Sequence, residues 1–387
     1  MRPKLLILSG LYPNPDNPER GTFVKLQAEE LAWEYEVRVI AWDFPGKACS
    51  WRWREGEIEV DYLRFKTMKS FFPSSIPAFR LYVLPHVKRI CSRWKPDLIQ
   101  VHDFAHLPGP WVLKSWLGRS TIPKFLTLHN LKSLPGLMNH PATNFIYATT
   151  LGKALGGWNC IFTVNQALAT QATKYGSKVL CVGNGVKEAD RMDNPVLREI
   201  RQWLGNGATK ILAVGNLIKS KGFDLLIRSV RDLRDEGLKA RVLIVGRGPE
   251  QQFLEDLVRE LGLEGQVRLY GPLPHGEVRS LYYDFDLFAL PSHNETFGMV
   301  YLEAAWAGIP SIGVRGQGIW GLFDQGSEAL FMEPGDQASL TDLMRQLIID
   351  PELRKRMGRN AKTKCEREFR LERVLAKMKA EYKRSMS

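Results

Sequence analysis

The chain has 387 residues, 44% of them hydrophobic, which is enough to bury more than one core, so two domains are expected. It contains no run of about eighteen uncharged apolar residues, and residues 1–10 lack a signal peptide's apolar region and cleavage site. We therefore expect a cytosolic protein rather than a secreted or membrane-spanning one. The five cysteines are scattered and never form a CxxC pair, which argues against a disulfide framework and against a zinc site.

Most of the net charge of +12 belongs to the N-terminal half of the chain. Residues 1–182 contain 23 Lys and Arg against 13 Asp and Glu, whereas residues 183–387 contain 31 against 29. No acidic residue occurs between Asp61 and Asp97, where eight bases are mixed with aromatic residues. A basic, aromatic surface suits an anionic membrane face. We therefore expect residues 62–96 to make a peripheral contact with an anionic membrane or a lipid-linked acceptor.

A second interpretation of the same segment stays open. It could be a solvated helix whose aromatic residues pack in the core, with Phe79, Leu81, Leu84 and Val87 forming the buried face. The 13 bases between Arg354 and Arg384 are mixed with acids and are typical of an ordinary helix surface.

The first half of the chain alternates apolar runs with helical patterns. Residues 4–9 predict a buried strand, followed by a loop and a helix over about 22–33, and residues 57–65 alternate like an exposed strand pair. Further strands are expected at 35–41, 97–101, 124–128, 159–164 and 178–182. This order predicts a doubly wound parallel sheet. Since ligands bind beyond the carboxyl ends of such strands, the loops at 10–17, 102–103 and 129–130 should crowd one edge.

The pattern pauses near residue 184, and a charged stretch runs to about residue 207. We place the domain boundary there, giving an N-terminal domain of residues 1–183 and a C-terminal domain of residues 184–367, with Asn184 in the hinge. A second doubly wound series follows, with strands expected at 210–214, 241–245, 266–270, 285–290 and 309–314 and helices at 223–235, 250–261 and 275–283. The chain ends in helices over 336–349 and from 351 onward. Two such domains should face each other across a cleft.

Two carboxylates frame the start of one apolar helix in the second series. Glu295 lies among turn-forming residues, and Glu303 interrupts residues 297–306, which otherwise carry no charge. If the helix begins near Thr296, roughly 12 Å of helical rise separates the two carboxylates, too far to chelate one ion. The free amides of the first turn form an anion site, and Gly298 lets a ligand approach the backbone. Groups that bind hydroxyls at both ends and negative charge in the middle describe a nucleotide-sugar site.

The Glu295-x7-Glu303 pattern, followed by residues 304–310 (AAWAGIP), resembles the signature of the family 4 retaining glycosyltransferases of the GT-B fold. Further matches fall in the family's order over nearly the whole chain: Tyr12-Pro13, 21–24, Pro96-Asp97, His129, 184–186, Val214-Gly215, Lys221-Gly222, 245–250, Gly271 and Asp286. The resemblance implies two Rossmann-like domains. It also implies sugar transfer from a nucleoside diphosphate sugar, with retained anomeric configuration and no obligatory metal or cofactor.

The resemblance also implies roles for individual residues of the C-terminal domain. Glu303 binds the donor ribose, and Glu295 contacts the transferred sugar. The backbone amides of Phe297, Gly298, Met299 and Val300 hold sugar and phosphate groups. Lys221 neutralises the diphosphate. The alternative interpretation is that Lys221 is an ordinary solvated lysine at the start of a helix, but a cation in that position opposes the helix dipole.

The chain departs from the family at three places beside this site. The family's phosphate-binding arginine falls on Asn216, and Lys219 could supply the missing charge. Arg247 stands where an acidic residue is common, in a Gly246-x-Gly248-Pro249 turn that we interpret as structural because it lacks the third glycine of a dinucleotide fingerprint. Residues 316–319 are an altered form of the usual Gly-Gly turn.

The N-terminal domain offers the other site candidates. His129 matches the family's histidine near the donor sugar and acceptor, and is assigned a catalytic role; its alternative is a core or strand-end histidine. His102 ends another strand and is an acceptor-side candidate. A loop that a ligand could approach is bracketed by Gly10, Tyr12 and Gly21. We assign Gly10 to the donor side and Tyr12 and Gly21 to the acceptor side. The alternative is that these residues only serve the geometry of an ordinary turn.

We expect the N-terminal domain to select a glycan or lipid-linked saccharide acceptor and the C-terminal domain to bind the nucleotide-sugar donor. Such an enzyme would act in cell-surface polysaccharide or glycolipid synthesis at the inner membrane face. The final helix, about 368–387, is expected to pack back on the N-terminal domain. Two other hypotheses remain: another nucleotide-sugar enzyme, such as an epimerase or an inverting transferase, and a noncatalytic anionic-surface binder. No recognised nucleic-acid module occurs, so no nucleic-acid partner is expected.

Overall fold

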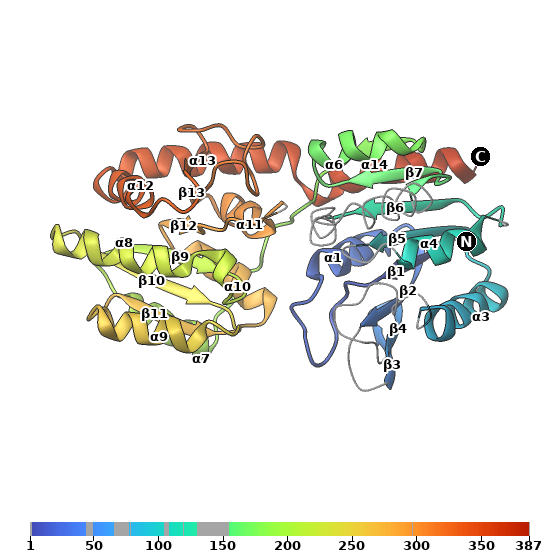
Figure 1. The fold of residues 1–387 in the computed structure, drawn as a ribbon, viewed down its shortest axis with the longest axis horizontal. Helices are drawn as coiled ribbons and strands as arrows, with labels where there is room; N and C mark the ends of the chain where they lie inside the picture. Colours follow the sequence, from blue (N-terminus) through green and yellow to red (C-terminus); the bar gives the residue numbers. More distant parts are fainter. Residues whose placement is uncertain are drawn as a thin grey trace, which may run out of the picture. The chain divides into compact units, whose positions relative to one another are not determined.

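The chain folds into two compact α/β units in a computed structural model that describes residues 2–43, 49–65, 77, 79–103, 108–118, 120–129, 155–295 and 297–386. Unit 1 comprises Met1–Gly185 and Leu371–Ser387, and unit 2 comprises Val186–Arg370 (Figure 1). Each unit is built around its own sheet, so each buries a core of its own.

Unit 1 holds an eight-stranded sheet in the order β3-β4-β2-β1-β5-β6-β7-β8. The strands are β1 (Lys4–Ser9), β2 (Glu36–Asp43), β3 (Cys49–Glu55), β4 (Ile58–Arg64), β5 (Leu98–Asp103), β6 (Lys124–Leu128), β7 (Cys160–Thr163) and β8 (Val179–Cys181). The helices are α1 (Thr22–Leu31), the π-helix η1 (Phe79–Val83), α3 (Leu84–Trp94), α4 (Pro108–Leu117), α6 (Gln166–Ala172), the 3₁₀ turn η3 (Thr173–Tyr175) and α14 (Leu371–Met386). All described neighbours pair in parallel except β3 and β4, which form an antiparallel hairpin at one edge.

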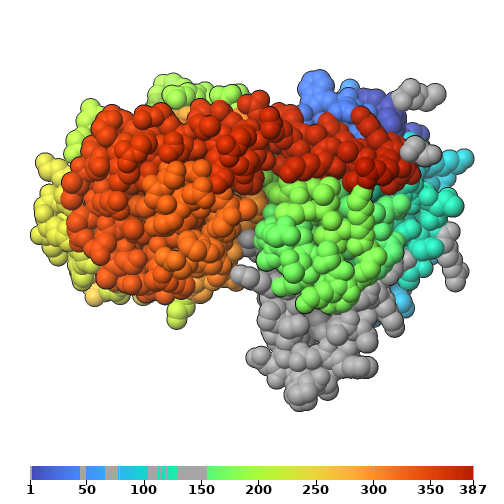
Figure 2. Space-filling view, turned by 90° about the horizontal axis from the view of Figure 1, so that it is seen from above, coloured from blue at the N-terminus to red at the C-terminus, as the bar shows by residue number. Residues whose placement is uncertain are grey.

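Helix α14 completes the core of unit 1 although it comes last in the sequence. Its residues Leu371, Val374 and Met378 belong to the same buried cluster as the strand residues Leu5 and Val39. The Tyr382 hydroxyl donates to Gln100 Oε1 in β5 at 2.8 Å. Figure 2 shows the helix, in red, lying along the green residues near 178, where Lys178 Nζ and Glu381 Oε2 lie 2.7 Å apart. The C-terminal helix thus packs as part of the core of the N-terminal unit.

Unit 2 holds a six-stranded, fully parallel sheet in the order β11-β10-β9-β12-β13-β14. The strands are β9 (Thr209–Val214), β10 (Ala240–Val245), β11 (Val267–Gly271), β12 (Leu287–Ala289), β13 (Ser311–Val314) and β14 (Ala329–Met332). The helices are α7 (Pro195–Leu204), the 3₁₀ turn η4 (Lys219–Lys221), α8 (Phe223–Asp235), α9 (Gln251–Glu260), α10 (His275–Leu281), the 3₁₀ turn η5 (Tyr282–Asp284), α11 (Met299–Ala307), α12 (Gln337–Ile349) and α13 (Pro351–Glu368). The strand order turns back at β9, which lies between β10 and β12, and this is the switch point of a doubly wound sheet.

An aspartate at the start of one strand fixes its register with a neighbour in each unit. Asp97, before β5, accepts from the Lys4 amide at 2.7 Å and donates its own amide to the Lys4 carbonyl at 2.9 Å. Asp286, before β12, makes the same pair of bonds to Lys210 at 2.8 and 2.9 Å. Two of the motif residues in the sequence therefore act on strand pairing.

Several expected elements need correction. Residues 57–65 were expected to lie exposed, but β4 is mostly buried between β3 and β2, and β3 is the half-exposed partner. The expected charged linker contains α7, whose Leu197, Ile200 and Leu204 are buried in unit 2. The sequence patterns missed the short strand β14, since four buried residues carry no period of their own. The final helix is interrupted after Glu368, so α13 and α14 belong to different units.

Candidate functional site

The segment between β12 and α11 carries the first candidate carboxylate outside the helix. Helix α11 begins at Met299, with Gly298 as its N-terminal flanking residue at φ 77°. The expected start near Thr296 is therefore wrong, although Thr296 itself lies outside the described residues. Phe297 and Gly298 lie in the loop. The free amides of the helix belong to Met299 and Val300, because the Tyr301 amide donates to the Gly298 carbonyl at 3.0 Å.

Glu295 is paired with Lys221. Lys221 Nζ lies 2.5 Å from Glu295 Oε2, and each side chain is only 16% exposed. Lys221 ends the η4 turn after β9, so the pair joins the loops that follow two adjacent strands, β9 and β12. Both residues lie at the carboxyl edge of the parallel sheet, where ligands of such sheets bind. The residues that the sequence assigned to sugar and diphosphate therefore lie together.

The Glu295 loop is held by close packing and by backbone contacts. Its amide donates to Gln317 Oε1 at 3.2 Å, and its carbonyl accepts from the Gly318 amide at 3.0 Å. A Cβ on Gly298 would lie 2.5 Å from the Tyr301 ring, so only glycine fits there. Burial raises the pKa of the Tyr301 hydroxyl well above its ordinary value, and the Glu295 carboxylate adds to this rise. The altered turn at 316–319 thus positions Glu295.

Glu303 is a buried carboxylate with a histidine partner that the sequence patterns missed. Its side chain is 6% exposed, and His275 Nε2 lies 2.8 Å from Glu303 Oε1. Since a carboxylate accepts, the histidine donates through Nε2. Burial raises the pKa of the Tyr282 hydroxyl well above its ordinary value, and the Glu303 charge adds to this. No sequence spacing links residues 275 and 303; only the packing of α10 against α11 joins them.

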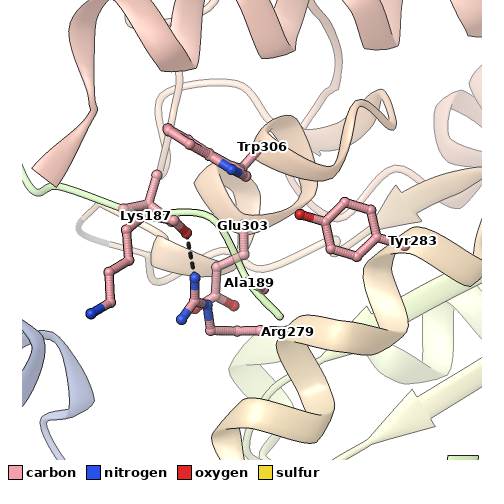
Figure 3. Close-up of a pocket in the computed structure, with 7 residues that line it drawn as sticks. Lys187, Ala189, Arg279, Tyr283, Glu303 and Trp306 are labelled. Atoms are coloured by element: carbon pink, nitrogen blue, oxygen red, sulfur yellow. Dashed lines mark hydrogen bonds between the residues drawn. The ribbon is translucent and has the colours of Figure 1, made fainter. Parts of the chain in front are cut away.

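A small hollow surrounds the other side of Glu303. It is lined by Val186, Lys187, Ala189, Arg279, Tyr283, Glu303 and Trp306. Figure 3 shows the Tyr283 ring and the Trp306 indole around the Glu303 side chain, with Arg279 donating to the Lys187 carbonyl. The Glu303 carboxylate thus lies in a pocket that provides both cationic and aromatic groups.

Asn216 and Lys219 lie in the loop after β9, close to Lys221. Both are exposed. A Cβ placed on Gly215 would lie 3.7 Å from Lys221 Cε, so the lysine stem passes over the residue that precedes Asn216. The neighbouring loop after β10 packs directly on this one, since a Cβ on Gly246 would lie 1.9 Å from the Gly215 carbonyl oxygen. Both glycines of the Gly246-x-Gly248 turn are therefore required by backbone packing, as the sequence indicated.

In unit 1 the structure brings His102 and His129 into direct contact. His102 Nδ1 lies 3.1 Å from His129 Nε2, and the rings stack with centroids 5.4 Å apart. Phe23 covers His129 at a centroid distance of 4.6 Å. Burial lowers the pKa of His102 to about 3, and burial together with His102 lowers the pKa of His129 well below its ordinary value. The pair is therefore neutral at pH 7, and one ring donates to the other.

The three remaining candidates of unit 1 have structural roles. Tyr12 is fully buried and its hydroxyl lies 3.3 Å from Glu55 Oε2, so its side chain packs in the core. Gly21 has φ 63°, and a Cβ there would lie 2.6 Å from the Leu11 carbonyl carbon. Gly10 packs against Trp42, with its Cβ position 3.3 Å from the indole Nε1. Turn and packing requirements account for all three residues.

The structure describes residues 62–65, 77 and 79–96 of the basic segment, and residues 66–76 and 78 lie outside the description. Phe79 and Val87 are buried as the core interpretation requires, but Leu81 is 69% exposed. Among the described residues, no helix is long and apolar enough to span a bilayer. Nor do three or more metal-ligating side chains gather anywhere in the described ranges. The segment thus combines a buried face with an exposed apolar and basic one.

The two Rossmann-like units, with a Glu-x7-Glu segment at the sheet edge of the second, define a GT-B glycosyltransferase. Two family models match: Glycosyltransferase Family 4 over residues 21–190 and Glycosyl transferases group 1 over residues 198–364. The chain belongs to the family 4, group 1 glycosyltransferases, and it is an enzyme of that kind.

Individual relatives agree with this assignment. N-acetyl-alpha-D-glucosaminyl L-malate synthase of Bacillus anthracis is 25% identical over 326 residues, which cover 83% of each chain. D-inositol 3-phosphate glycosyltransferase of Corynebacterium kroppenstedtii is 34% identical over 162 residues, which cover 40% of this chain and only 36% of that enzyme. The structure of HepE of Anabaena in complex with UDP-glucose has a TM-score of 0.70 at 18% identity, covering 97% of this chain and 99% of that one. This last likeness demonstrates the fold.

Proposed function

We propose that the protein transfers a sugar from a nucleoside diphosphate sugar, with retained anomeric configuration, to a glycan or lipid-linked saccharide of the cell surface. The observation that carries the proposal is the arrangement at the carboxyl edge of the unit 2 sheet. A buried carboxylate and the free amides lie on helix α11, and a partly buried lysine–carboxylate pair joins the loops after β9 and β12. The UDP-glucose complex of the fold relative HepE supports a donor of this class.

Each group of the site has a place in this reaction. The Glu303 carboxylate accepts from the ribose hydroxyls, while Glu295 accepts from hydroxyls of the transferred sugar. Lys221 and the amides of Met299 and Val300 stabilise the negative charge that develops on the leaving diphosphate. This stabilisation needs only groups of the chain, so the proposal includes no obligatory metal.

Retention follows from attack on the same face as departure. The bond from the anomeric carbon to the phosphate oxygen breaks, and the bond to the acceptor oxygen forms on that face. The acceptor proton passes to a phosphate oxygen of the leaving group, which keeps the step balanced without a protein nucleophile. In this proposal unit 2 binds the donor and unit 1 selects the acceptor, and His129 of unit 1 is assigned a catalytic role.

A donor screen tests the proposal. The protein is incubated with UDP-, GDP-, ADP- and dTDP-sugars, and both thermal unfolding and hydrolysis are measured. We expect one donor to stabilise the protein by about 2.7 kcal/mol at a hundred times its Kd. NMR of the product should show the donor's anomeric configuration. An inverted product would contradict retention, and the lack of any stabilising donor would contradict the donor site.

The proposal includes a peripheral contact of unit 1 with an anionic membrane. Leu81 is 69% and Tyr82 53% exposed in η1, which leads directly into the basic helix α3, so two exposed apolar and aromatic side chains adjoin a basic helix. The exposed bases of η1, α3 and the residue after α3 are Arg80, Lys88, Arg89, Arg93 and Lys95. Apolar insertion and attraction to anionic lipid act together on such a surface.

Vesicle binding tests this contact. We expect the protein to sediment with phosphatidylglycerol vesicles at low salt but not with phosphatidylcholine vesicles. Because each base near the surface contributes about 1 kcal/mol, Lys88→Gln with Arg93→Gln should weaken binding roughly tenfold or more. The matched control is Arg356→Gln with Arg359→Gln, which removes two exposed bases from α13. If both double variants lose vesicle binding equally, the binding depends on the net charge of the protein and not on this surface of unit 1.

A further inference from the structure

The loop after β10 carries an exposed arginine, Arg247, beside the loop that leads to Lys221. Lys221 is the cation nearest to Glu295, and at 2.5 Å the two charges cancel. A nucleoside diphosphate brings at least two negative charges, so a site for it needs further positive charge. Asn216, the position that would naturally provide it after β9, is neutral.

Hydrogen bonds join the loops that follow β9 and β10. The ladder of the two strands ends with Val214 opposite Val245. Beyond it, the Gly215 amide donates to the Val245 carbonyl at 3.0 Å, and the Leu217 amide donates to the Arg247 carbonyl at 2.9 Å. These bonds place residue 216 in the loop beside the one that carries residue 247.

Arg247 and Asn216 therefore belong to neighbouring loops at the carboxyl edge of the sheet, and both are exposed. The two loops pack backbone to backbone, because a Cβ on Gly248 would lie 2.3 Å from the Leu217 carbonyl oxygen and one on Gly246 would lie 1.9 Å from that of Gly215.

We propose that Arg247 supplies the guanidinium that binds the donor diphosphate, from the strand beside the one that carries Lys221. The inference rests on the proposed function and adds a binding residue to it. The stem of Lys221 passes over Gly215, which precedes Asn216, and the Arg247 carbonyl accepts from the amide of Leu217, which follows Asn216. An arginine reaches further than an asparagine and binds two phosphate oxygens with its planar fork. The phosphates would then lie above Asn216, between the two cations.

A charge-relocation experiment tests the inference. The wild type is first titrated calorimetrically with UDP, GDP, ADP and dTDP, and the diphosphate that binds is then compared with its nucleoside. We expect Arg247→Ala to weaken diphosphate binding about tenfold or more, because a hydrogen bond to a charged group is lost. Binding of the nucleoside should stay unchanged. Adding Asn216→Arg to Arg247→Ala should restore affinity to within about threefold of the wild type, because the two positions lie on hydrogen-bonded neighbouring loops.

Controls separate this inference from folding and from the function itself. Arg259→Ala removes an exposed arginine of α9 that pairs with Asp256, and should change neither affinity. If Arg247→Ala does not fold, as judged by thermal unfolding, Arg247→Gln replaces it in both backgrounds. Unchanged diphosphate binding, an equal loss for the nucleoside, or a loss that Asn216→Arg does not restore would each overturn the role of Arg247 and leave the proposed function standing. If no diphosphate binds the wild type, both fail.

Discussion

Replacing Glu303 by glutamine is expected to weaken donor binding at least a hundredfold. The carboxylate is 6% exposed and already held by His275 at 2.8 Å, so in the proposed site it is preorganised to accept from two ribose hydroxyls. Glutamine keeps the volume and one acceptor, but loses the charge that makes each bond strong. Two bonds to a charged group contribute about 3–6 kcal/mol together, which corresponds to a hundredfold or more in Kd.

Calorimetric titration with the nucleoside diphosphate measures this effect, and thermal unfolding verifies that the variant is folded. The matched control is Glu333→Gln, which removes the same charge from an exposed pair of unit 2 with Arg315. It should bind the donor as the wild type does. A Glu303→Gln variant whose Kd stays within about threefold of the wild type would remove Glu303 from the ribose site.

Replacing Lys221 by methionine should lower kcat by about 10²–10³-fold. The reason is that the lysine opposes the charge developing on the leaving diphosphate in a partly buried site, where one such donor contributes that much. The same substitution leaves Glu295, 16% exposed, without its cation. We therefore also expect the free energy of unfolding to fall by about 1–3 kcal/mol, less than for a fully buried pair.

The double variant Lys221→Met with Glu295→Gln separates the two effects. Removing both charges should restore most of the stability, since no uncompensated carboxylate remains. It should not restore turnover. Urea unfolding and steady-state kinetics with the identified donor measure the two quantities. If the double variant recovers activity along with stability, Lys221 supports the fold only and takes no part in the reaction.

The sequence by itself determined the architecture. Apolar strands alternating with helical patterns predicted two doubly wound units, and they are confirmed because both period and order are local properties of the chain. The ordered motifs identified the family before any contact was known. Glu295 and Lys221 were assigned to one site from 74 positions apart, and the structure joins them.

Other features depended on contacts that no local pattern records. The sequence predicted one continuous helix from about residue 296, whereas a glycine at φ 77° delays its start to Met299. The sequence placed Tyr12 in a loop that a ligand could approach. In the structure Tyr12 is fully buried, because the loop folds back over the β3–β4 hairpin to Glu55.

The tertiary structure alone supplied the partners. His275 meets Glu303 through the packing of α10 on α11, and His102 meets His129 through neighbouring parallel strands. Arg247 was only a departure from a motif until the hydrogen-bonded loops after β9 and β10 set it beside Asn216. The sequence determines which side chains end each strand, since hydrophobic periodicity is local. Which of them meet depends on strand order and register, and these are set by long-range packing of the whole sheet.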